Sequence, residues 1–349
     1  MKLRYLPLSI FCLLIALLSS SFAAAQEATP EAMSELGTEA DLEPTEDEMA
    51  AALEALGEDG FIGIIACTFG SEYHFTVADT ALQYATELGL RAEVFDSQVN
   101  VERQISAIES FTANGVDVLV ICLFDPPSVL SALEAADAAG VKIVQYAGRQ
   151  LADLGGVTIS IEDADLGRAA GEYAATLITD EMGGEANVAI LDYPDVANVV
   201  IRADAIRAAL EEGAPNAVIV GNYLGGTTEN GLASMESALI EHPEINVVVS
   251  INDAGAYGAM QALENAGSTD AILVGIDAEE QARGLILEGG MYRGTIDTSP
   301  ARTGELTINA AIKLLAGSEI PQNVAVPVTL MDAAVLAEIA AEATPEAAS

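Results

Sequence analysis

NVAILDY, residues 187–193, is a short apolar run that begins a second copy of a pattern already present in the first half of the chain. A helical pattern follows it over 198–212, and a second apolar run, AVIVGNY, follows at 217–223. Runs of this length and composition predict strands buried on both faces, because a half-exposed strand would alternate apolar and polar residues. Their alternation with helices predicts a parallel sheet.

The same alternation extends in both directions from this stretch. In the first half it predicts strands at 61–67, 91–96, 116–122 and 142–147, with helices at 74–88, 101–114 and 127–139. In the second half it predicts strands at 187–193, 217–223, 246–252, 271–277 and 293–297, with helices at 198–212, 229–241 and 254–266. Two successive copies of one α/β plan predict two similar Rossmann-like lobes.

The composition excludes several classes of partner. The chain has 349 residues, about half of them apolar, which is enough for two buried cores. With 54 acidic and 13 basic residues, the net charge is -41. Binding to phosphates or to anionic lipid requires concentrated Lys and Arg, so we expect neither a nucleic-acid nor a membrane-surface partner. The acidity predicts a solvated surface suited to a salty medium, and an acidic patch for a basic partner is the alternative.

The two ends of the chain differ from its centre. Residues 1–25 combine Lys2 and Arg4 with an apolar run and a small-residue end, which predicts a signal peptide and a periplasmic or extracellular location. Residues 26–58 are acidic and rich in Ala, Pro and Thr, which predicts a disordered tether with a possible short helix at 46–56 behind the capping box of Thr45 and Glu48. We expect residues 341–349 to be a disordered tail.

The stretch CTFGSEYHFT, residues 67–76, places a cysteine seven residues before a histidine. A nucleophile with its base and a metal half-site both need consideration. No oxyanion-hole motif accompanies the pair, and Cys67 closes an apolar strand, so we expect no enzyme, no cofactor and no metal. If the four strands predicted in the first half, numbered in chain order, lie in the sheet in the order 2-1-3-4, then Cys67 and Cys122 end neighbouring strands. There they either form a disulfide or remain free thiols.

Ligands of open parallel sheets bind beyond the carboxyl ends of the strands. Several residues that follow the predicted strands are planar and form several hydrogen bonds, namely Arg149, Arg202, Asn252 and Asp277. A carboxylate or amide can bridge adjacent hydroxyls while an arginine donates to other oxygens, and Tyr73, His74 or Phe124 offers a flat face to a sugar ring. The structural alternative is that such residues cap the next helix or pack in the core.

Six segments together resemble the periplasmic sugar-binding proteins of the ribose-binding type, the type I solute-binding proteins of ABC transporters. They are VFDSQVNVERQISAIESFTANGVDVLVI (94–121), GRQ (148–150), DADLGRAAGEYA (163–174), HPEINVVVSINDAGAYGAMQALENAG (242–267), ILVGIDA (272–278) and GTIDTSPARTG (294–304). The likeness covers about residues 61–336. It implies the type I periplasmic binding protein fold, with an N-terminal lobe of 59–160 plus 299–327, a C-terminal lobe of 161–298 plus 328–340, and a ligand cleft between them.

The resemblance also assigns site residues. The family's binding arginines correspond to Arg149 and Arg202, its asparagine to Asn252, its aspartate to Asp277, and its two stacking aromatics to Tyr73 and His74. Other positions depart from the family: Ser71 and Cys122 replace asparagines, and Thr298 replaces a glutamine. We therefore expect the ligand-binding set to be Ser71, Tyr73, His74, Cys122, Arg149, Arg202, Asn252, Asp277 and Thr298, and the ligand to be a sugar or polyol other than ribose.

The function that this resemblance implies is capture of a small carbohydrate by closure of two lobes hinged near 160, 298 and 327, and delivery to the membrane permease of an ABC importer. We expect a monomer. A receptor that passes a nucleoside, polyol or furanone signal to a sensor kinase or chemoreceptor remains the alternative. Repressors that share this plan carry an N-terminal DNA-binding domain, and here the corresponding part of the chain is the acidic segment.

Overall fold

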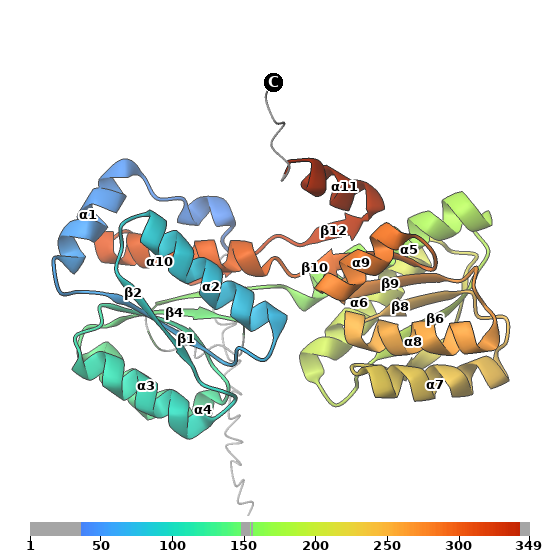
Figure 1. Ribbon diagram of the computed structural model, residues 1–349, viewed down its shortest axis with the longest axis horizontal. Helices are drawn as coiled ribbons and strands as arrows, with labels where there is room; N and C mark the ends of the chain where they lie inside the picture. The colour runs from blue at the N-terminus through green and yellow to red at the C-terminus, as the bar shows by residue number, and fades with distance from the viewer. Residues whose placement is uncertain (1–35, 148–153, 155, 343–349) are drawn as a thin grey trace, which may run out of the picture. The chain divides into compact units, whose positions relative to one another are not determined.

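The structure is a computed structural model that describes residues 36–147, 154 and 156–342 (Figure 1). Within these residues the strands form two six-stranded sheets, ordered β11-β5-β4-β3-β1-β2 and β12-β10-β9-β8-β6-β7. Each sheet has helices on both faces, and we call the two assemblies the N-terminal and the C-terminal lobe. The expected fold class, two parallel-sheet α/β lobes, is confirmed.

The sheet of the N-terminal lobe is parallel throughout. It comprises β1 Ile62–Ala66, β2 Ala92–Asp96, β3 Val118–Cys122, β4 Lys142–Tyr146, β5 Gly156–Ser160 and β11 Asn323–Ala325. Successive side chains of a strand point to opposite faces, so Ile64 packs under α2 Glu72–Glu87 and α10 Pro300–Ala316, whereas Ile65 packs under α3 Val101–Ala113 and α4 Pro126–Ala138. Two buried cores result, one on each face.

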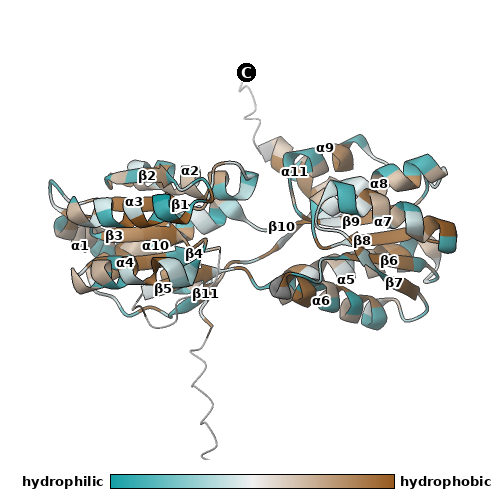
Figure 2. Ribbon diagram, turned by 90° about the horizontal axis from the view of Figure 1, so that it is seen from below, coloured by the Kyte–Doolittle hydropathy of each residue, from teal (hydrophilic) through white to brown (hydrophobic). Residues whose placement is uncertain are grey.

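The C-terminal lobe repeats this plan with one antiparallel edge strand. Its strands are β6 Asn187–Asp192, β7 Val218–Leu224, β8 Val247–Ser250, β9 Ile272–Asp277, β10 Tyr292–Asp297 and the antiparallel β12 Thr329–Asp332. Its helices are α5 Asp163–Met182 and α6 Ala197–Gly213 on one face, and α7 Thr228–Glu241, α8 Asp253–Ala266, α9 Glu280–Glu288 and α11 Ala333–Glu342 on the other. Figure 2 shows apolar strands between helices whose outer faces are polar.

The chain passes between the two sheets at three places. These crossings follow β5 at Ser160, β10 at Asp297 and β11 at Ala325, close to the expected positions near 160, 298 and 327. Ser299 connects two of them, because its hydroxyl donates to the carbonyl of Pro327 at 3.0 Å. Each lobe is therefore assembled from two separate parts of the sequence.

Residues 36–58 of the expected tether are structured, and the possible short helix at 46–56 is present. A short 3-10 helix at Glu39–Leu42 is followed by α1 Glu46–Leu56, which begins at the predicted capping box of Thr45 and Glu48. Leu42 is fully buried, and α1 packs against α10. The acidic composition is compatible with folding here, because Leu42, Ala52 and Leu56 join the buried core of the N-terminal lobe.

Ion pairs complete the docking of this N-terminal segment. Arg302 on α10 bonds Glu39 at 2.8 Å and Glu43 at 2.6 Å, and Lys313 on the same helix bonds Glu48 at 3.1 Å. Gly37 forms an isolated parallel bridge with Val324 in the edge strand β11. The segment thus places its acidic residues against two of the chain's few cations.

Some expectations concern residues outside the described ranges. The signal peptide at 1–25, the first part of the tether and Arg149 fall there, as do residues 343–349 of the expected tail. Residues 341–342 of that tail belong instead to α11. Across the described residues, we found no helix with both the length and the apolar character needed to cross a membrane.

Candidate functional site

A pocket with a volume of about 1140 Å³ opens at the carboxyl ends of strands from both sheets. Its lining includes six of the nine expected ligand-binding residues: Ser71, Tyr73, His74, Arg202, Asp277 and Thr298. A smaller hollow of 340 Å³ lies on the surface of α5, away from the strand ends. The pocket at the strand ends is therefore the candidate ligand site.

Arg202 organises the charged side of this pocket. Its Nε donates to Asp163 Oδ1 at 2.5 Å, and its Nη1 donates to the Ile251 carbonyl at 3.1 Å and lies 3.7 Å from Asp277 Oδ1. Gly167 lets α5 approach α6 here, because a Cβ at that position would lie 2.2 Å from the Arg202 carbonyl oxygen. The guanidinium is thus held in one orientation between two carboxylates, which leaves it preorganised for ligand oxygens.

Asp277 reaches the pocket from a strained turn at the end of β9. Its φ is 117° and that of Ala278 is 53°, values that L-residues rarely adopt and that cost about 1–3 kcal/mol each. Burial raises the pKa of Asp277 well above its usual value, and the Arg202 guanidinium opposes this shift. The side chain keeps 32% exposure, so its carboxyl group is accessible to a ligand in the pocket.

Aromatic rings form the wall that the N-terminal lobe contributes. Tyr73 and His74 open α2, and their rings meet edge to face with centroids 5.2 Å apart. Burial lowers the pKa of His74, which favours the neutral imidazole, and no group among the described residues bonds its Nδ1. An apolar sugar face and a hydroxyl both find partners on this wall.

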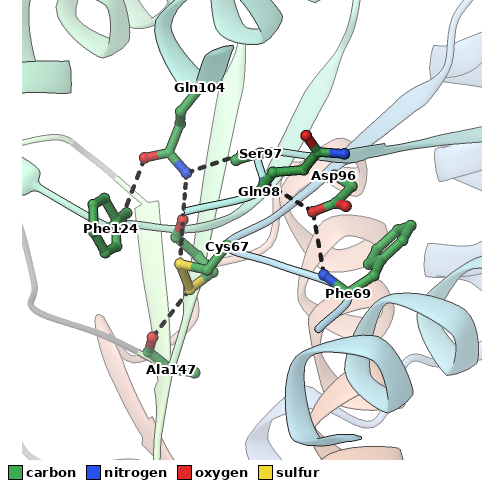
Figure 3. The surroundings of a disulfide bond; sticks show 9 residues. Cys67, Phe69, Asp96, Ser97, Gln98, Gln104, Phe124 and Ala147 are labelled. Atoms are coloured by element: carbon green, nitrogen blue, oxygen red, sulfur yellow. Dashed lines mark hydrogen bonds between the residues drawn. A yellow bond between two sulfur atoms is a disulfide. The ribbon is translucent and has the colours of Figure 1, made fainter. Parts of the chain in front are cut away.

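Cys67 and Cys122 form a disulfide behind this wall (Figure 3). Cys67 directly follows β1 and Cys122 ends the neighbouring strand β3, with Cα atoms 5.3 Å apart. The buried Gln104 holds the chain after β3, because its Nε2 donates to the Cys122 carbonyl at 2.8 Å and its Oε1 accepts from Phe124 N at 3.3 Å. Of the two alternatives for the cysteines, the structure has the bridge, so neither sulfur is a free nucleophile or a thiolate ligand beside His74.

Two of the expected residues, Cys122 and Asn252, do not line the pocket, and a third, Arg149, lies outside the described residues. The Cys122 sulfur is bonded to that of Cys67 in the disulfide. The Asn252 side chain caps α8 by accepting from Gly255 N at 3.0 Å, and it donates to the Gly226 carbonyl at 3.0 Å. For Asn252 the structure therefore supports the capping alternative, and a role in ligand binding would require its side chain to exchange these partners.

Charged residues outside the expected ligand-binding set also line the pocket: Glu72, Asp163, Glu279, Arg283 and Asp297. Glu72 Oε1 pairs with Arg283 Nη2 at 3.2 Å, although the two residues are far apart in sequence. Glu72 stands between Ser71 and Tyr73, and Glu279 follows Asp277 by two positions, so their proximity to expected site residues was the available signal. Asp163 is the first residue of α5, just after the first crossing, and its ion pair with Arg202 places it in the site.

Residues 62–319 match the periplasmic binding protein domain, a span of well over half the chain. The chain belongs to this family. The ribose import binding protein RbsB of Bacillus subtilis is 27% identical over 271 residues, which cover 77% of this chain and 86% of that protein. The D-apiose import binding protein of Actinobacillus succinogenes is 27% identical over 248 residues, which cover 71% of this chain and 79% of that protein.

Solved structures of such proteins have the same fold. A periplasmic solute-binding protein of an ABC transporter from Actinobacillus succinogenes, with bound D-allose, has a TM-score of 0.68 and 25% identity, covering 80% of this chain and all of its own. A periplasmic ribose ABC transporter protein from Conexibacter woesei has a TM-score of 0.72 at 21% identity, covering 82% and 96%. The family resemblance expected from the sequence is confirmed, and this is a family of substrate-binding proteins, not of enzymes.

Proposed function

We propose that this periplasmic binding protein captures a small carbohydrate, a monosaccharide or polyol, by closing its two lobes, and delivers it to the membrane permease of an ABC importer. The observation that carries the proposal is one pocket that combines a fixed arginine between two carboxylates with an aromatic wall. Charged groups that bond several hydroxyls, opposed by flat rings, suit a polyhydroxylated ring.

The positions of the crossings support a closing mechanism. The pocket lining includes Ser160, Ile161 and Thr298 at the first two crossings, so the connections between the lobes border the site itself. A ligand that contacts both lobes favours the closed arrangement by the difference in its affinity for the two states. Ser71 and Thr298, which replace larger amides of the ribose-binding type, favour a ligand other than ribose.

A thermal-shift panel tests the binding part of the proposal. Pentoses, hexoses, polyols and nucleosides are each added to purified protein, and we expect a pentose, hexose or polyol to raise the Tm in proportion to the logarithm of its concentration above Kd. Titration calorimetry then gives Kd and a stoichiometry near one. Stabilisation by nucleosides alone, or by no compound in the panel, would reject a carbohydrate ligand.

Uptake measurements test the importer part. We expect deletion of the gene to abolish uptake of the radiolabelled ligand at low concentration, and the wild-type gene to restore it. A gene encoding Arg202→Ala should be exported to the same level without restoring uptake. Normal uptake in the deletion strain, with loss of a ligand-dependent transcriptional or chemotactic response, would point to a receptor that feeds a sensor.

A further inference from the structure

The turn that carries Asp277 into the pocket is held from behind by one buried acid. Asp253, the first residue of α8, is fully buried, and its Oδ2 accepts from Glu279 N at 2.9 Å. Its Oδ1 accepts from Thr295 Oγ1 at 2.8 Å, and that hydroxyl oxygen accepts from Ala278 N at 3.1 Å. The two backbone amides after Asp277 are therefore both fixed by Asp253, one directly and one through Thr295.

Neighbouring groups are arranged around the same carboxyl group. The Tyr292 hydroxyl donates to Asp253 Oδ1 at 2.7 Å, and the Tyr257 hydroxyl donates to Glu279 Oε2 at 2.9 Å. Gly275 in β9 makes room for this cluster, because a Cβ there would lie 2.1 Å from the Tyr292 hydroxyl oxygen and 2.2 Å from Asp253 Oδ1. Residues of α8, β9 and β10 thus converge on one acceptor behind the turn.

The conformation of the turn explains why such a support is needed. Asp277 and Ala278 both have positive φ, and neither is a glycine that would adopt this conformation freely. A strained backbone persists only where surrounding bonds determine it. Bonds to the amides of Ala278 and Glu279 supply that constraint, while Asp277, Ala278 and Glu279 themselves line the pocket.

We propose that Asp253 is a positioning residue of the ligand site, which holds the Asp277–Glu279 turn so that the Asp277 carboxyl group faces a bound sugar. Asp253 does not itself line the pocket. The proposal rests on the proposed function for its ligand, but the positioning of the turn can be measured without one.

Asp253→Asn is the sharpest variant, because it keeps the shape of the side chain. The three donors around Asp253 are two hydroxyls and one amide, and an amide side chain has a single acceptor oxygen. In either orientation of the new amide, at least one buried donor loses its acceptor. Thr295→Val removes only the link to Ala278 N, so it serves as a second variant with a smaller expected effect.

Asp270→Asn provides the matched control, since Asp270 is an exposed aspartate beyond the opposite end of β9. Hydrogen exchange followed by mass spectrometry compares the three variants with the unliganded wild type. In Asp253→Asn we expect amides of the 277–279 turn to exchange about tenfold faster or more, while peptides from β6 and β8 keep their protection. Thr295→Val should affect the turn less, and Asp270→Asn should not affect it.

Calorimetry with D-ribose, D-allose, L-arabinose and xylitol gives the second readout. For the compounds that wild type binds, we expect Asp253→Asn to weaken affinity about tenfold or more, as misplacement of a charged hydrogen-bond partner does. Unchanged exchange in the turn, equal acceleration in every segment, or faster exchange with unchanged affinity would each overturn the positioning role. If wild type binds none of the four and no compound of the wider panel, the proposed function fails, while the exchange data still decide whether Asp253 holds the turn.

Discussion

At the residue scale, Arg202 illustrates how one side chain can serve several partners at once. A guanidinium presents its donors in a fixed plane, so Nε can bond Asp163 while Nη1 bonds the Ile251 carbonyl and faces Asp277. An ammonium group has no such geometry and stays more strongly hydrated. Charge alone is therefore insufficient at this position.

Arg202→Lys should weaken sugar binding by about 2 kcal/mol or more, because carboxylates buried in the pocket lose part of their bonding. Arg207→Lys is the matched control on the same helix, where the arginine is partly exposed and bonds Asn222 and Glu211 outside the pocket. Titration calorimetry with the sugar that binds wild type measures both. Equal affinities for the two variants would remove Arg202 from the site.

Asp253 also links stability to pH. Burial raises the pKa of Asp253 to about 7, and the bonds from Tyr292, Glu279 N and Thr295 oppose the shift in part, while the Glu279 carboxylate adds to it. Between the unfolded value near 3.8 and about 7, the folded protein binds the extra proton, so stability falls as pH rises through this window, by up to about 4 kcal/mol. Above pH 7 this contribution no longer changes.

Asp253→Asn should therefore flatten the decline in unfolding free energy between pH 5 and pH 7.5. Urea unfolding at several pH values measures the slope for wild type and variant. Neighbouring Asp277, whose pKa is raised by burial and also by the Asp253 carboxylate, remains in both proteins, so the difference between the two slopes reports Asp253 together with its effect on Asp277. Parallel slopes would show that Asp253 titrates at its ordinary value.

At the element scale, the strands and helices of both lobes could be predicted because each carries its own signal. Consecutive Val and Ile residues marked the buried strands, such as Val247–Ser250, and the capping box of Thr45 and Glu48 marked the start of α1. Docking of α1 could not be predicted, because it depends on Arg302 and Lys313, which lie more than 250 positions further along the chain. Asp163 was hidden for a similar reason, because its partner Arg202 lies 39 positions further along the chain.

The docking of α1 makes two leucines of one helix unequal. Leu56 keeps 7% exposure, whereas Leu53 keeps 41%. Leu56→Ala should destabilise the protein by about 2–4 kcal/mol through the lost apolar burial and the cavity left behind, and Leu53→Ala by less than about 1 kcal/mol. Urea unfolding with a common m-value compares them, and equal small losses would mean that α1 is not docked in solution.

The disulfide joins two strands of one sheet across a separation of 55 residues. Closing a loop of that length removes entropy from the unfolded chain worth about 4 kcal/mol in the chain-entropy model. The double variant Cys67→Ala, Cys122→Ala should lose stability of that order, and added reductant should destabilise wild type without affecting the variant. Alkylation of both cysteines in the unreduced, denatured protein would show that the bridge is absent.

At the scale of the whole molecule, the acidic surface is the dominant electrostatic feature. The chain has a net charge of -41 and only 13 basic residues. Two of these basic residues, Arg302 and Lys313, form three ion pairs with the N-terminal segment. Acidic residues outnumber basic residues by 41, so repulsion among carboxylates acts against the compact state. Salt screens this repulsion between exposed charges strongly, whereas it weakens the partly buried ion pairs much less.

Raising NaCl from about 0.1 M to about 1 M shortens the Debye length from about 10 Å to about 3 Å and should stabilise the folded protein, with a higher urea midpoint at constant m-value. The variant Glu102→Lys, Glu109→Lys provides the control, because both glutamates are exposed on α3 and each reversal adds two charges, which takes the net charge from -41 to -37. We expect it to be more stable than wild type at low salt and to gain less from NaCl, because less repulsion remains to be screened. A urea midpoint that falls with NaCl in both proteins would show that attractive ion pairs, and not the excess of carboxylates, govern the electrostatic part of the stability.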